Sequence, residues 1–101
     1  MKTTTVVSVL AAASSAMAIS CVPGQTYCGA VLLRRGNYHE QINEALLREG
    51  KPTNSHHVLE SLFYCTDDED YVIWKATCRP GKCQDAGTGR PDYCIGDPEE
   101  Q

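Results

Sequence analysis

The six cysteines are the residues of this chain whose chemistry is easiest to anticipate. They are Cys21, Cys28, Cys65, Cys78, Cys83 and Cys94. Cysteine side chains join in disulfides or bind a metal such as zinc as thiolates. Zinc sites usually need two close pairs such as C-x2-C, whereas Cys78 and Cys83 enclose four residues and the other spacings are longer. An even number of cysteines in a short chain therefore predicts three disulfides and no metal site.

The sequence leaves the disulfide pairing open, because six cysteines allow about fifteen connectivities. One pairing is disfavoured. If residues 58–65 and 71–78 form a hairpin, Cys65 lies beside the turn and Cys78 at the far end of its strand, roughly 20 Å away at about 3.3 Å per residue. A disulfide needs Cα atoms within about 7 Å of each other. Cys65 and Cys78 are therefore expected to pair with other cysteines.

The histidines are the natural candidates for a general base. They are His39, His56 and His57. The chain has neither a G-x-S-x-G nor an H-E-x-x-H motif, so no nucleophile and base stand together in the sequence. Two carboxylates suffice in some glycosidases, but a chain this small has no obvious second lobe to form a cleft. We therefore expect solvent-exposed histidines, no enzymatic activity and no cofactor.

The acidic run at residues 67–70 could supply hard oxygen ligands to calcium through Asp67, Asp68 and Asp70. It lacks the spaced acids, the central glycine and the distal glutamate of an EF-hand loop. A solvated hairpin tip is the better interpretation, and such a tip could contact a partner.

Two other segments are candidates for contact with a partner. Arg34 and Arg35 form a dibasic pair of the kind that secretory processing proteases cut, or they are simply the exposed end of their segment. The loop at residues 84–93 is rich in turn-forming residues and lies between cysteines. Disulfide scaffolds carry function on such loops. The complete predicted interaction surface is Arg34, Arg35, Asp67, Asp68, Asp70, Asp85, Arg90 and Asp92.

The first residues resemble a secretory leader. Lys2 is followed by a mostly apolar run at residues 6–13, and residues 16–18 have the small-x-small pattern that signal peptidase requires. We predict a signal peptide at residues 1–18 and one secreted, cysteine-rich domain at residues 19–101. The apolar run is too short to span a bilayer, so no membrane anchor is expected and the mature protein should be extracellular.

Charge excludes some partners. The formal net charge is -4, and loss of Lys2 with the leader would make it -5. Nucleic acids and anionic membranes reward clustered lysine and arginine, so neither is expected as the main partner. The sequence does not decide between a monomer and a homodimer.

The elements that must position these residues begin with a predicted hairpin of residues 58–65 and 71–78. Both runs are rich in β-branched and aromatic residues. In the second run Val72, Trp74 and Ala76 point to one face, which should be the face toward the core.

A helix is predicted over residues 38–49. Asn37 and Glu40 have the spacing of a capping box, and Gly50 with Pro52 gives a stop signal. The apolar stripe of this helix should pack on the hairpin. We expect a common core of Ile42, Leu46, Leu62 or Phe63, and Trp74.

The remaining segments are shorter. Residues 30–33 fit either a buried strand or the start of a helix. We predict a connecting loop at residues 51–57, an edge strand at residues 93–95 and a frayed tail at residues 96–101. The expected class is α+β: a small disulfide-stapled antiparallel sheet packed against one or two helices.

The whole pattern resembles small secreted cysteine-rich proteins of filamentous fungi. The resemblance lies in the frame from Cys21 to Gly36 (C-x-PG-x-x-YCG-x-x-LL-x-x-G), in SLFYC at 61–65, in the Asp-Ala-Gly-x-Gly segment and in the D-Y-C at 92–94. Such proteins are described as candidate effectors or elicitors acting on plants, and the resemblance implies virulence-related binding of a host extracellular protein or glycan. It loosely implies the α/β sandwich of killer-toxin subunits. The alternative is a toxin or antimicrobial protein acting on competing cells.

Overall fold

The computed structural model describes residues 21–68 and 70–101, and the predicted leader lies outside them. The α+β class is confirmed, with three helices, a three-stranded antiparallel sheet and a two-stranded one in this part of the chain. The elements in chain order are β1 (Thr26–Cys28), α2 (Gly29–Arg35), α3 (His39–Arg48), α4 (Ser55–Leu59), β2 (Ser61–Cys65), β3 (Val72–Thr77), β4 (Cys83–Gln84) and β5 (Tyr93–Cys94).

The predicted hairpin is confirmed as β2 and β3, which pair from Cys65 opposite Val72 beside the turn to Ser61 opposite Thr77 at the far end. The face prediction is also confirmed, because Val72, Trp74 and Ala76 are buried. A strand that the sequence did not reveal, β1, pairs with the other edge of β2. The central strand of the larger sheet is therefore β2.

The predicted helix at residues 38–49 is confirmed as α3, but the predicted cap is wrong. The N-cap residue is Tyr38, without a side-chain capping bond, and Asn37 lies one residue outside. Tyr38 is buried, and its hydroxyl accepts a hydrogen bond from the Cys21 backbone N–H at 2.8 Å. Burial of the tyrosine ring fixes the start of the helix in place of a polar cap.

The prediction of a connecting loop at residues 51–57 is wrong at its end, because α4 begins there. Asn54 is the N-cap of α4, and its Oδ1 accepts the His57 backbone N–H at 2.8 Å. The helix extends to Leu59, so the strand starts at Ser61, three residues later than expected. The open question at residues 30–33 is decided in favour of a helix, α2.

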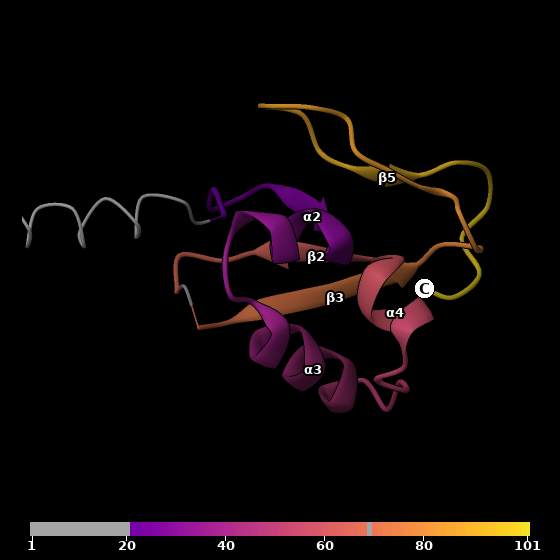
Figure 1. The fold of residues 1–101 in the computed structure, drawn as a ribbon, viewed down its shortest axis with the longest axis horizontal. Helices are drawn as coiled ribbons and strands as arrows, with labels where there is room; N and C mark the ends of the chain where they lie inside the picture. Colours follow the sequence, from indigo (N-terminus) through magenta and orange to yellow (C-terminus); the bar gives the residue numbers. More distant parts are fainter. Residues whose placement is uncertain (1–20, 69) are drawn as a thin grey trace, which may run out of the picture.

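The helices pack on the larger sheet, α3 against β3 and both α2 and α4 against β2 (Figure 1). Ile42, Leu46, Phe63 and Trp74 lie in one buried cluster, as predicted, and Phe63 rather than Leu62 is the member from β2. No helix in the described part of the chain is long and apolar enough to cross a bilayer.

Gly29 brings α2 close to its neighbours. A Cβ atom at this position would lie 1.7 Å from the Val58 carbonyl oxygen and 3.3 Å from the Phe63 ring. Only a residue without a side chain fits this approach. The glycine therefore sets the distance between α2, the end of α4 and β2.

The prediction of a frayed tail at residues 96–101 is wrong. The Thr77 backbone N–H donates to the Glu100 carbonyl at 2.8 Å, and the Glu99 N–H donates to the Thr77 carbonyl at 2.7 Å. The tail thus adds one antiparallel bridge to the outer edge of β3. The end of the chain lies beside α4 (Figure 1).

Candidate functional site

The prediction of three disulfides is confirmed, and Cys65 and Cys78 have different partners, as expected. The bridges are Cys21–Cys65, Cys28–Cys83 and Cys78–Cys94. No cysteine in the described part of the chain is free. The first bridge ties the entry segment to the end of β2, and the other two hold the small sheet of β4 and β5.

The small sheet presents the loop at residues 84–93, and a disulfide anchors each of its strands. Cys83 of β4 is bound to β1, and Cys94 of β5 is bound to Cys78 at the end of β3. The two strands pair antiparallel, with Cys83 opposite Cys94. In Figure 1 this sheet lies on the side of the molecule away from α3. Both ends of the loop are thus fixed covalently to the larger sheet.

Asp92 holds the loop from inside. It is only 5% exposed, and its Oδ2 accepts the Cys28 backbone N–H at 2.9 Å. Its Oδ1 accepts the Ala86 N–H, also at 2.9 Å, while its own N–H donates to the Thr26 carbonyl at 3.0 Å. The carboxylate therefore links both limbs of the loop to β1, which is a supporting role and not an exposed contact.

Replacing Asp92 by Asn is expected to lower the free energy of unfolding by about 1–3 kcal/mol, because an amide has one acceptor oxygen and would leave a buried N–H without its partner. Chemical denaturation of the oxidised protein measures this change. Asp85→Asn is the matched control. Its side chain is 50% exposed, so the same substitution should cost less than about 1 kcal/mol. Equal losses in the two variants would contradict the role given to Asp92.

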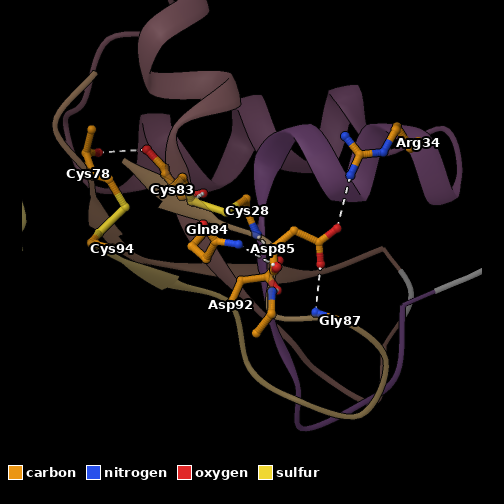
Figure 2. Close-up of a disulfide and its surroundings, with 12 residues drawn as sticks. Cys28, Arg34, Cys78, Cys83, Gln84, Asp85, Gly87, Asp92 and Cys94 are labelled. Atoms are coloured by element: carbon orange, nitrogen blue, oxygen red, sulfur yellow. Dashed lines mark hydrogen bonds and ion pairs between the residues drawn. A yellow bond between two sulfur atoms is a disulfide. The ribbon is translucent and has the colours of Figure 1, made fainter. Parts of the chain in front are cut away.

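The exposed side of the loop faces the end of α2. Arg34 Nη2 lies 3.3 Å from Asp85 Oδ2, and Asp85 Oδ1 accepts the Gly87 N–H at 3.0 Å. Figure 2 shows Arg34 extending from the helix toward this carboxylate. Two segments that the sequence proposed separately, the dibasic pair and the loop, are therefore neighbours in space.

A cavity of about 280 Å³ lies between these segments. Its lining comes from the entry segment, β1, α2 and the loop: Val22, Gln25, Tyr27, Val31, Arg35, Asp85, Gly87, Thr88, Gly89, Arg90 and Asp92. Val22, Val31 and the Tyr27 ring provide an apolar surface. Apart from two glycines, the other lining residues are polar or charged. The cavity therefore suits a ligand that combines an apolar body with a polar group.

The acidic groups around the cavity are already bound by other protein groups, whereas one of the basic groups is open to a ligand. The Asp85 carboxylate is paired with Arg34, and both oxygens of Asp92 accept backbone N–H groups. The guanidinium of Arg35 lies over the Tyr27 ring, 5.2 Å from its centroid. Arg90 is exposed and forms no ion pair within residues 21–68 and 70–101. The cavity therefore favours a ligand with a negative or hydrogen-bond-accepting group.

The acidic tip is a separate surface. Asp67 and Asp68 are exposed at the turn between β2 and β3, and Asp70 N–H donates to Asp68 Oδ1 at 2.9 Å. None of these residues lines the cavity. In the described part of the chain no three acidic, histidine or cysteine side chains are grouped so as to hold a metal ion.

The histidines lie away from the cavity. His39 is exposed on α3, but His57 is only 7% exposed, so the prediction of solvent histidines is wrong for this residue. The sequence did not predict the burial of His57, because this histidine lies against Glu100 of the tail, and the tail was expected to be frayed.

Comparisons with protein families, curated proteins and solved structures find no match to this chain.

Proposed function

We propose that residues 19–101 form a secreted binding protein of the effector or elicitor kind, which recognises a host extracellular component without making or breaking a bond. One observation carries the proposal: two segments distant in sequence, the end of α2 and the loop at residues 84–93, meet around a cavity with an apolar surface and the exposed guanidinium of Arg90.

The way the loop is held supports a binding role. Disulfides fix both of its strands, and the buried Asp92 fixes its limbs. A loop ordered before binding loses less conformational entropy when it meets a partner, so more of the contact free energy appears as affinity. The three disulfides also suit an oxidising, extracellular compartment.

The experiment is a capture of host extracellular protein or glycan by the oxidised protein, followed by affinity measurement with the partner obtained. Arg90→Glu should weaken this affinity by about ten-fold or more, because it places a like charge against the acceptor group of the ligand. Arg79→Glu is the matched control, since Arg79 is exposed in the turn before β4 and does not line the cavity. Equal affinities for Arg90→Glu and the unaltered protein would overturn the proposal.

A killing assay on microbial cells decides between this proposal and the alternative of a killer-toxin-like or antimicrobial protein. Direct killing with no host component captured would support the alternative and refute an effector role. Leaf infiltration with the same preparation gives the complementary readout for an elicitor.

A further inference from the structure

Two histidines of α4 face two glutamates of the tail, on a part of the molecule that the binding proposal does not use. His56 Nε2 lies 2.9 Å from Glu99 Oε1, and His57 Nε2 lies 3.1 Å from Glu100 Oε1. Lys51 Nζ lies 3.7 Å from the same Glu100 oxygen. Each of these three contacts joins groups that are charged or can become charged.

The number of protons on His57 follows from its neighbours. Asn54 Oδ1 accepts the His57 backbone N–H, which identifies this atom as the oxygen of the amide. The same oxygen lies 2.8 Å from His57 Nδ1, so Nδ1 must donate. The other ring nitrogen, Nε2, faces a carboxylate oxygen of Glu100, which only accepts when ionised. Both hydrogen bonds form together only if the ring carries two protons.

Loss of one proton breaks the arrangement in either tautomer. If Nδ1 keeps its proton, the Nε2 lone pair faces the Glu100 carboxylate. If Nε2 keeps it, the Nδ1 lone pair faces the Asn54 oxygen. The His57 side chain is only 9% exposed, so water cannot readily reach the ring nitrogen that has lost its proton, and its lone pair is left facing an oxygen lone pair at a cost in free energy.

We propose that the tail, residues 96–101, is a proton-dependent clasp. It is docked on β3 and α4 while His57 is an imidazolium, and it is released when His57 loses a proton. Histidine is the side chain that ordinarily changes charge between about pH 5 and pH 8. Docking is therefore strong on the acidic side of this range and weak on the alkaline side.

The other charged groups at the contact do not replace this switch. Lysine and glutamate are residue types whose ordinary pKa values lie outside this pH range. The His56 side chain is 26% exposed and that of His57 is 9% exposed, so water can replace the partner of the His56 ring more readily. His57 is the ring whose two nitrogens are both engaged by protein oxygens.

Docking can be followed at single amides by hydrogen exchange. The Thr77 and Glu99 N–H groups bond across the clasp, so their protection reports whether the tail is in place. Relative to intrinsic exchange rates, their protection should fall about ten-fold or more between pH 5 and pH 8, the factor expected for one charge-assisted hydrogen bond. The Tyr64 amide, in the central strand β2, should stay protected throughout.

Glu100→Gln is the decisive variant. A glutamine carboxamide can accept from a charged His57 and can donate to a neutral one, so the tail should stay docked at pH 8. His56→Gln should keep the pH dependence of the unaltered protein. Unchanged Thr77 protection between pH 5 and pH 8 in that protein would overturn the clasp. A loss of Thr77 protection in Glu100→Gln as large as that in the unaltered protein would also overturn it. The same holds if the Tyr64 amide loses protection in parallel with Thr77, or if Thr77 protection in His56→Gln does not change with pH.

Discussion

Replacing both Cys28 and Cys83 by alanine is expected to lower the free energy of unfolding by about 4 kcal/mol, since their bridge closes a loop of 55 residues. Cross-linking of distant residues removes conformations from the unfolded chain, and the effect grows with loop length. This bridge also joins β1 to β4, so its loss frees one strand beneath the 84–93 loop. The variant should therefore lose partner affinity as well as stability.

Chemical denaturation of the variant with its other bridges intact measures the change, after mass mapping of the remaining disulfides. The Cys78→Ala and Cys94→Ala double variant is the matched comparison, because it removes a bridge of sequence separation 16 from the same small sheet. Chain entropy predicts a smaller loss, about 3 kcal/mol. A larger loss in this comparison than in the Cys28 and Cys83 variant would show that strain or packing, and not loop length, decides the contribution of these bridges.

The parts of the fold that the sequence predicted are those specified by local pattern. Alternating apolar residues around Trp74 indicated β3 and its buried face, and the stripe through Ile42 and Leu46 indicated α3. Both patterns repeat over several residues within one segment. Local propensity and burial agree there, so little tertiary information was needed.

The parts that were missed depend on distant partners. β1 has only three residues, too few for a period, and it is a strand because β2 offers it an edge. The tail has one proline and three acids among six residues, yet Thr77 and His57 hold it. Tertiary contacts of this kind leave no periodic signal in the sequence.

The candidate site shows the same division. The sequence named the dibasic pair and the loop at residues 84–93, but not their contact through Arg34 and Asp85. It also placed Asp92 among the contact residues, whereas Asp92 is buried beneath the loop. Exposed and buried carboxylates cannot be distinguished by residue type. The one signal available was position: Asp92 lies two residues before Cys94, and side chains two apart in an extended segment point to the same face.

Phe63→Ala is expected to lower the free energy of unfolding by about 3–5 kcal/mol, the range for removing a large aromatic ring from a core. Phe63 is fully buried on the central strand, where its pairing partners are Tyr27 of β1 and Trp74 of β3. Its ring would contact a Cβ atom at Gly29, so it also fills the space beneath α2. Three elements thus meet at this ring, and none of the disulfides can close the cavity that its removal leaves.

The adjacent Leu62 provides the control, because it is only partly buried and lies outside the main cluster. Leu62→Ala removes less area from the interior and should cost no more than about 2 kcal/mol. Denaturant midpoints with all three bridges intact compare the two variants, and an unchanged denaturant slope shows that the unfolded state is the same. Similar losses for both variants would mean that the sheet is stabilised equally on its two faces. A larger loss of unfolding free energy for Phe63→Ala than for Leu62→Ala is expected here, because the core of the protein lies on the helical side of β2 with Phe63 at its centre.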